Sequence, residues 1–444
     1  MFSVLAHRTY RHLFLAQVIA LAGTGLATIA LGLLAFEIAG SDAGAVLGTA
    51  LAIKMVAYIG IAPVVGAYAD RLPRKSLLVA MDVVRAAVAL VLPFVDAVWQ
   101  VYLLIFVLQS ASAAFTPTFQ ATIPEILPDE DEYTSALSLS RLAYDLESLL
   151  SPLLAAALLT VISFHWLFAG TSIGFVVSAL LVVTAALPHR TAAARAVESV
   201  WRKTTRGARI YLRTPRLVGL LAVTLAAAAG SAMVIVNTVV IVKGMDGSQE
   251  DVAWALAAYG GGSMLAALLL PRLLKAVSDR TAMLAGSVVL AAALSLFGIV
   301  ALRSGGAIGW PVLLGGWLVM GLGYSLCVTP GGRLLRRSST DEDRPALFAA
   351  QFALSHVCWL IAYPVAGQVG SLAGMGVAFA SLALLAIIGV TLAALQWPKM
   401  DPVVLVHEHP ELPEDHPHLL EHGSGAHRHA YVIDELHGNW PGRA

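Results

Sequence analysis

Residues 66–75 read Gly-Ala-Tyr-Ala-Asp-Arg-Leu-Pro-Arg-Lys, a short charged stretch between two long apolar runs. The flanking runs, at about 44–69 and 77–96, are each as long as the roughly 20 apolar residues that a helix needs to cross a bilayer. Because charged side chains are costly in hydrocarbon, the stretch is predicted to be a loop at the membrane surface that joins two membrane-spanning helices.

The same alternation of apolar runs and charged breaks extends over most of the chain. Of the 444 residues, 58% are hydrophobic and 13% are charged, whereas soluble proteins carry about 25% charged residues. The apolar runs predict twelve spans, at 11–39, 44–69, 77–96, 98–121, 133–162, 165–187, 216–242, 250–274, 280–302, 308–334, 344–370 and 374–397. The expected fold class is therefore an all-α membrane protein with twelve transmembrane helices in two six-helix bundles.

The predicted domains follow from these spans. The bundles occupy 1–187 and 216–397, and a basic linker at 188–215 joins them. A His-rich tail at 398–444 is expected to be disordered. Lys and Arg gather in alternate loops and in the linker, which predicts that both termini lie in the cytoplasm of a multi-pass protein of the bacterial plasma (inner) membrane. Binding to anionic lipid is enough to explain the Lys and Arg residues of the predicted cytoplasmic loops, so no nucleic acid is expected as a partner.

The stretch at 66–75 resembles the signature of the major facilitator superfamily, Gly-x-x-x-Asp-Arg-x-Gly-Arg-Lys, which stands between the second and third spans. The matching residues are Gly66, Asp70, Arg71, Arg74 and Lys75, and Pro73 stands where Gly is usual. The resemblance implies alternating access, with these charges acting as a conformational latch that does not select the substrate. Asp82 and Arg85, three apart in the third span, are predicted to be an ion pair that supports the latch. The alternative is that the charges only mark a cytoplasmic loop.

Further stretches resemble one subgroup of that superfamily. Residues 115–117 and 123–125, together with Asp82-x-x-Arg85, are similar to the subgroup that holds the enterobactin exporter. Residues 117–124, 136–145 and 344–351 are similar to nickel- and cobalt-resistance exporters, several of which end in a His-rich tail. This resemblance implies a transition metal as substrate.

Ionisable side chains inside spans are functional candidates by default. The candidates for proton coupling or the ion path are Lys54, Arg141, Asp145, Glu147, Asn237 and His356. Lys54 needs a carboxylate partner from another helix, and Glu37, Asp145 and Glu147 are the choices. Asp145 or Glu147 is expected to carry the coupling proton, and the alternative is a permanent salt bridge with Arg141 or Lys54. His356 with Asn237 is predicted to contact the ion, unless His356 only bonds a neighbouring helix.

The tail contains eight of the thirteen histidines: His407, His409, His416, His418, His422, His427, His429 and His437. In an extended chain, residues i and i+2 point to the same side, so each His-x-His pair offers two nitrogens together. Neutral imidazole is a common ligand of transition metals. We therefore predict loose, exchangeable metal binding, although a merely solvated acidic tail is the alternative. The tail has no Cys, which disfavours a rigid structural zinc site.

These observations predict a secondary active exporter of Ni(II), with Co(II) as a further cargo, driven by inward proton flow. A siderophore or drug exporter with a metal-sensing tail is one alternative, and it would need a large, aromatic-lined cavity. A membrane-anchored metal buffer or sensor is another. No P-loop motif supports ATP as the energy source, and no nucleophile–base spacing supports an enzyme. No cofactor is required; Ni, Co or Zn enters as substrate or tail ligand. The expected partners are the bilayer, the metal ion and protons, and the protein is expected to be a monomer.

Overall fold

The computed structural model describes residues 2–68, 73–187, 200–303, 308–340, 343–402, 404–409, 413, 417–422, 425–434 and 436–441. The first half forms α1 (Arg8–Ala39), α2 (Ala43–Tyr68), α3 (Arg74–Val91), α4 (Val98–Ile126), α5 (Glu130–Leu159) and α6 (Phe164–Thr184). The second half forms α8 (Pro215–Lys243), α9 (Gln249–Ala276), α10 (Asp279–Arg303), α11 (Trp310–Val328), α13 (Arg344–Pro364) and α15 (Met375–Gln396).

Shorter elements connect or extend these helices. They are η1 (Phe2–Ala6), η2 (Gly40–Asp42), η3 (Leu92–Phe94), the linker helix α7 (Val200–Arg213), α12 (Gly331–Arg337), the π-helical turn η4 (Val365–Val369) and α14 (Gly370–Ala373). The tail adds β1 (Val404–His407), α16 (Pro417–His422) and β2 (His427–Ala430).

The long helices correspond one to one with the twelve predicted spans. In the described part of the chain, ten stretches are long and apolar enough to cross a membrane. The first stretch, Arg8–Ala62, contains both α1 and most of α2, so the ten stretches account for eleven of the long helices, and the 30-residue α5 is the twelfth. Large apolar side chains such as Trp99, Trp166 and Leu268 point outward and are more than half exposed. An outer surface of this kind is suited to lipid.

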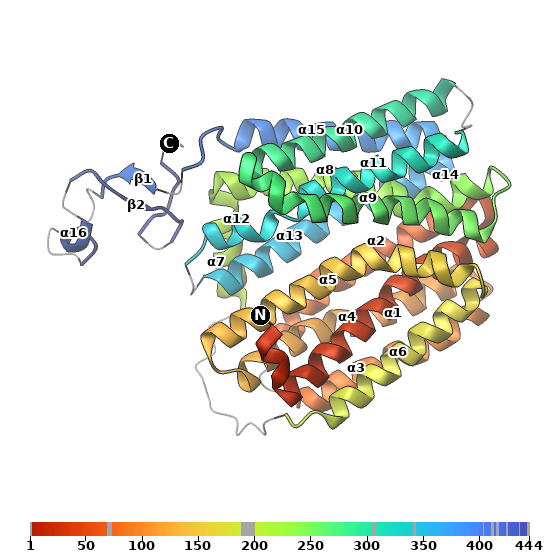
Figure 1. Cartoon of the computed structure of the whole chain (residues 1–444), viewed down its shortest axis with the longest axis horizontal. Coiled ribbons are helices and arrows are strands. Elements are labelled where there is room, and N and C mark those ends of the chain that lie inside the picture. Colours follow the sequence, from red (N-terminus) through yellow and green to blue (C-terminus); the bar gives the residue numbers. More distant parts are fainter. Residues whose placement is uncertain are drawn as a thin grey trace.

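The helices pack as two bundles, which form the upper and lower layers in Figure 1. In the first bundle α6 packs against α1 and α3, and α2 against α4. In the second, α11 packs against α9, and α15 against α8 and α10. Glycine allows one very close approach: a Cβ on Gly321 of α11 would lie 1.9 Å from the carbonyl oxygen of Tyr259 in α9. The bundles meet each other mainly through α2 with α13 and through α5 with α9.

Both chain termini lie at one end of the bundles, which we call the tail side, and the opposite end is the far side (Figure 1). The bundles are closed against each other on the far side. A Cβ on Gly367 of η4 would lie 2.2 Å from the carbonyl oxygen of Gly44 in α2. Gln368 Nε2 also donates a hydrogen bond to Thr49 Oγ1 at 2.9 Å, and Ser371 donates one to Asp42.

The linker helix α7 lies along the tail-side end of α13. Arg206 forms an ion pair with the buried Asp343, with 2.7 Å between Nε and Oδ1. Tyr211 donates a hydrogen bond to Gln351 of α13. A Cβ on Gly207 would lie 2.2 Å from the carbonyl oxygen of Ala346, so only glycine allows this close contact. The linker helix α7 therefore belongs structurally to the second bundle.

The described parts of the tail are ordered, which differs from the disorder expected from its composition. Strands β1 and β2 pair antiparallel, with His407 opposite His427 and Leu405 opposite His429. The physical reason is that Tyr431, Ile433 and Trp440 of the tail are buried in a hydrophobic cluster that they share with the helices of the second bundle. The polar composition of the tail masks these few residues in a sequence analysis.

Candidate functional site

Two opposite charges meet inside the first bundle, where it faces the second. Lys54 comes from α2 and Glu147 from α5, and both are half-buried. Their charges are close enough to attract each other. Glu147 also lies against α1, because a Cβ on Gly25 would be only 2.7 Å from its Oε1. Because Gly25 has no side chain, α1 leaves space for the carboxylate of Glu147 between α1, α2 and α5.

The second bundle covers this pair with rings of α13. His356 stacks on Tyr58 of α2 with 5.3 Å between ring centroids, and Phe352 lies 5.8 Å from the same ring. The ammonium of Lys54 is 6.0 Å from the Tyr58 centroid, at the outer range of a cation–π contact. His356 Nδ1 lies 2.6 Å from the carbonyl oxygen of Phe352, to which it donates. His356 is therefore a contact between the two bundles.

Aromatic side chains continue along the second bundle from this point. Tyr259 of α9 packs on Tyr324 of α11 at 5.9 Å, Tyr324 on Trp359 at 6.4 Å, and Trp359 on Tyr363 at 5.2 Å. The charge of Glu147 acts on Tyr363, which connects this aromatic row to the Lys54–Glu147 pair. These rings do not stand out as a site in the sequence, because aromatic residues in membrane helices are usually packing residues.

The other predicted ion-path residues are distributed differently. Asn237 is buried on α8, where it donates to the carbonyl oxygen of Ala366 at 2.9 Å. Ala366 lies ten residues beyond His356, or about 15 Å along a helix, so Asn237 and His356 do not share a site. Glu37 faces His165, with 3.7 Å between their charged atoms, and among the described carboxylates Glu147 is the one whose charge acts on Lys54. Arg141 and Asp145 belong to α5, but their side chains lie outside the described residues.

The predicted latch is described in part. Gly66 lies in α2, whereas Asp70 and Arg71 lie outside the described residues. Arg74 begins α3, and Lys75 Nζ donates to the carbonyl oxygen of Ala185, just after α6, at 2.9 Å.

Asp82 and Arg85 form an ion pair in the interior of the first bundle, as their spacing predicts. Ser178 of α6 donates to Asp82 Oδ2 at 2.7 Å. The Arg85 guanidinium lies 4.2 Å from the ring centroid of Phe115 in α4. The pair therefore joins α3 to α4 and α6.

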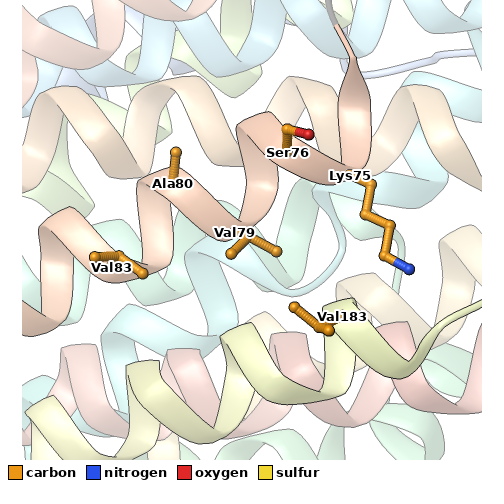
Figure 2. A pocket seen from close by; sticks show the side chains of 6 residues that line it. All are labelled: Lys75, Ser76, Val79, Ala80, Val83 and Val183. Atoms are coloured by element: carbon orange, nitrogen blue, oxygen red, sulfur yellow. The ribbon is translucent and has the colours of Figure 1, made fainter.

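A hollow of about 430 Å³ lies beside Lys75, between α3 and α6. Figure 2 shows Val79, Val83 and Val183 lining it, with Lys75 at its tail-side edge. Val83 and Val183 are about half exposed, so this hollow opens on the outer, lipid-facing surface. It is not part of the Lys54–Glu147 site.

Six of the eight tail histidines converge. In two overlapping groups of four, one ligand atom from each residue lies within 4.8 Å of the others. One group holds His407, His418, His427 and His429, and the other holds His407, His409, His418 and His437. The His407 and His437 Nε2 atoms are 3.1 Å apart, and those of His418 and His427 are 3.2 Å apart. His416 and the side chain of His422 lie outside the described residues.

Acceptors outside the cluster hold the Nδ1 atoms of several of these rings. His407 Nδ1 lies 3.2 Å from the carbonyl oxygen of Leu405, and His427 Nδ1 lies 2.9 Å from that of Gly425. His437 Nδ1 lies 2.9 Å from Asp434 Oδ1, a partner that its i, i+3 spacing could have suggested. Burial and the neighbouring imidazoles lower the pKa of His407 to about 4, so this ring is neutral at pH 7.

The carboxyl of Asp434 also has a shifted pKa. Burial would raise it, but the hydrogen bonds from His437 and Leu436 outweigh burial and lower the pKa. Asp434 therefore remains a carboxylate, which suits a residue that orients an imidazole from behind.

Comparison with known proteins identifies the family. The model of the Major Facilitator Superfamily matches residues 13–248 and 220–416. The chain belongs to this superfamily. It is therefore a multi-pass membrane transporter. The predicted fold class is confirmed, whereas the narrower resemblance to metal-resistance exporters stays a prediction.

Two curated relatives are similar in sequence. Macrolide efflux protein A of Streptococcus pyogenes is 26% identical over 152 residues, which cover 32% of this chain and 37% of that protein. The uncharacterized MFS-type transporter YfiS of Bacillus subtilis is 24% identical over 332 residues, which cover 72% of this chain and 77% of that protein. The match to the macrolide efflux protein thus spans little more than a third of its length.

Solved structures share the fold of this major facilitator at low sequence identity. The nucleoside transporter NupG has a TM-score of 0.67 and 14% identity, with 88% of this chain and 100% of that chain covered. A bacterial homologue of the lysosomal transporter Spinster, in an inward-facing and unoccupied conformation, has a TM-score of 0.66 and 12% identity, with 89% and 99% covered. These structures support the fold alone.

Proposed function

We propose that this major facilitator exports a divalent transition-metal ion, Ni(II) or Co(II), from the cytoplasm in exchange for protons. The observation that carries the choice of substrate is the convergence of six imidazoles in the tail. Imidazole nitrogen is a preferred ligand of these ions, and the tail contains no cysteine to favour softer ones. We place the tail side in the cytoplasm of a bacterial inner membrane because the Lys and Arg residues gather there. An exporter takes its substrate from that side.

Glu147 is the group that we assign to proton coupling. It lies within the membrane-spanning part of α5, faces Lys54 and acts on Tyr363 across the junction of the bundles. When the bundles rock, α13 moves relative to α2 and α5, so the surroundings of the carboxylate change. A carboxylate whose partner and solvent access alternate can take up a proton on one side and release it on the other.

The tail cluster supplies the substrate and lies outside the translocation path. It is attached to the tail-side end of the second bundle through Asp401, which bonds Arg337 at 2.7 Å. A binding site tethered this way raises the local concentration of its ion at the entrance between the bundles. Removal of the tail should therefore weaken export at low metal concentration and spare it at high concentration.

Efflux of radioactive nickel from preloaded bacterial cells tests this function. The wild type should lower retained nickel, and Glu147→Gln should retain as much nickel as cells without the protein. Glu37→Gln is the matched control, because Glu37 is a carboxylate at a span end that faces His165 instead of Lys54. If the wild type, at normal expression, leaves nickel and cobalt retention unchanged, metal export is wrong.

A second candidate function is export of an organic amphiphile. The row of Tyr259, Tyr324, Trp359 and Tyr363 beside Glu147 favours it, because flat apolar substrates bind well to aromatic surfaces. The similarity to a macrolide efflux protein is compatible with this reading. The same cells should then retain less of a labelled macrolide, with nickel unaffected, and Trp359→Ala should reverse the effect.

A further inference from the structure

We propose that the tail histidines form one six-coordinate metal centre for a single divalent ion of the Ni(II) type. The six residues are His407, His409, His418, His427, His429 and His437. They come from β1 and the residues after it, from α16, from β2 and from the segment at 436–441. The proposal concerns the tail and holds whether or not the bound metal is also the transported substrate.

The rings are arranged as the corners of an octahedron. Each ring is flanked by four others at centroid distances of 4.5 to 5.6 Å. This leaves one opposite partner for each ring, and the opposite pair His407 and His418 is 6.4 Å apart. With metal–nitrogen bonds of about 2.1 Å, centroids around one ion should be about 4.6 Å apart for neighbours and about 6.4 Å for opposite rings.

The nitrogen distances agree with the same geometry. Three pairs of Nε2 atoms are neighbours: His407–His437 at 3.1 Å, His409–His437 at 3.2 Å and His418–His427 at 3.2 Å. Adjacent ligands of an octahedral ion are about 3.0 Å apart at the bond length above, and those of a tetrahedral ion about 3.4 Å apart. Small ring rotations suffice to bring these nitrogens onto one ion.

The two groups of four describe a single site. Both contain His407 and His418, and an Nε2 lone pair can bind only one metal ion. Two ions cannot therefore occupy both groups with full ligand sets. One ion placed between His407 and His418 is within reach of the remaining four rings.

The surroundings of the cluster favour the ligand form of the imidazoles. The carbonyl oxygens of Leu405, Gly425 and Ala430 accept from the Nδ1 atoms of His407, His427 and His429. Asp434 does the same for His437. A proton held on Nδ1 leaves the Nε2 lone pair for a metal, which is how metal-binding histidines are usually oriented. Pairing of β1 with β2 sets His407 opposite His427 before any ion arrives.

Six neutral nitrogens distinguish among ions by coordination number. Structural zinc sites are almost always four-coordinate and tetrahedral, so Zn(II) would leave two of the imidazoles unused. Ni(II) readily accepts six nitrogen ligands, and imidazole suits it. The cluster should therefore hold Ni(II) through all six rings.

Binding at this centre would also fasten the end of the chain. His437 is next to Gly438, whose carbonyl oxygen accepts from Arg213 of α7 at 2.7 Å. Trp440 lies 4.8 Å from the buried guanidinium of Arg216 at the start of α8. An ion that joins His437 to the hairpin therefore also holds the segment at 436–441 against the linker and the second bundle.

The test is a Ni(II) titration of the purified full-length protein, combined with X-ray absorption of the loaded sample. We expect one Ni(II) per chain, six nitrogen neighbours at about 2.1 Å and slower hydrogen exchange in residues 427–441. His418→Ala should weaken binding at least ~10-fold, and Asp434→Asn should weaken it ~10-fold while leaving the ligands in place. His165→Ala, a histidine of the first bundle, should bind as the wild type does.

Several results would overturn the centre. They are two or more equivalent ions per chain, four or fewer nitrogen neighbours on Ni(II), or unchanged affinity in His418→Ala. Asp434→Asn keeps every imidazole, so it provides a second test if His418→Ala fails to fold. These measurements are made at equilibrium without transport, so they stay informative if the efflux experiment shows that nickel is not exported.

Discussion

The buried guanidinium of Arg216 faces the carboxylate of Asp401, with 3.3 Å between Nε and Oδ1. Arg216 lies in the first turn of α8 and is 1% exposed, and Asp401 is where the chain leaves the second bundle for the tail. The carboxylate also accepts from Arg337 at 2.7 Å and from Trp397 Nε1 at 3.3 Å. One carboxylate thus pairs with two arginines at the place where the tail attaches.

Asp401→Ala should destabilise the protein by about 3 kcal/mol, because it leaves the buried charge of Arg216 without a partner. The measurement is thermal unfolding of the purified protein in detergent. Asp96→Ala removes an exposed carboxylate before α4 and should leave the melting temperature unchanged. Equal melting temperatures for the two variants would show that Arg216 does not depend on Asp401.

Exchange of the charges at Lys54 and Glu147 tests whether they act as a pair. Lys54→Glu places two carboxylates together and should abolish efflux, since like charges in a low-dielectric site repel strongly. The double variant Lys54→Glu with Glu147→Lys restores the attraction and should recover part of the activity. Efflux from preloaded cells is the readout for all variants. A double variant as inactive as the single one would argue that only the original positions of the charges matter.

Gly367→Ala should open the contact between the bundles on the far side. Its Cβ would lie 2.2 Å from the carbonyl oxygen of Gly44, so η4 and α2 must separate. Crowding of this kind typically costs about 1–3 kcal/mol. Gly315→Ala is the matched control, because nothing lies within 4 Å of a Cβ at that position. Distances between spin labels on the two bundles should lengthen on the far side in Gly367→Ala and remain as in the wild type in Gly315→Ala.

The Asp82–Arg85 pair should behave as a coupled unit. Arg85→Met alone leaves a buried carboxylate and should cost about 3–5 kcal/mol, whereas joint replacement with Asp82→Asn should cost much less. The Ser178 hydroxyl can still bond the amide in the double variant. Thermal unfolding of the two single variants and the double variant gives the coupling energy. Additive losses would mean that the two side chains act separately.

Most of the fold could be predicted from the chain because membrane spans are encoded locally. A run of about 20 apolar residues can form all of its backbone hydrogen bonds within one helix, whatever its position in the chain. The predicted span at 216–242 therefore matches α8 (Pro215–Lys243) within a residue at each end. The loop at 66–75 likewise indicated the family, since its motif is defined by the order of the residues along the chain.

The sequence narrows the possible partners of a residue inside the bundles, but it does not identify the partner that the residue has in the structure. Lys54 had three candidate carboxylates, and its proximity to the charge of Glu147 depends on how α2 and α5 are rotated about their axes. Asn237 and His356 were paired in the sequence analysis, yet they lie at different heights along the second bundle. Helix rotation and relative height come from side-chain packing between helices, which no single helix specifies.

In the tail, too, the sequence predicts the chemistry of single residues, and only the packing determines which residues meet. Its composition alone indicates a preference for transition metals, since imidazole chemistry belongs to each histidine separately. Convergence of His407 and His437, thirty positions apart, instead requires the β1–β2 pairing and the burial of Tyr431 and Trp440. Spacing along a chain specifies which side chains share a face of one strand or helix. Contacts between separate segments arise only when those segments pack, because burial of distant apolar groups supplies the free energy that holds the polar ones together.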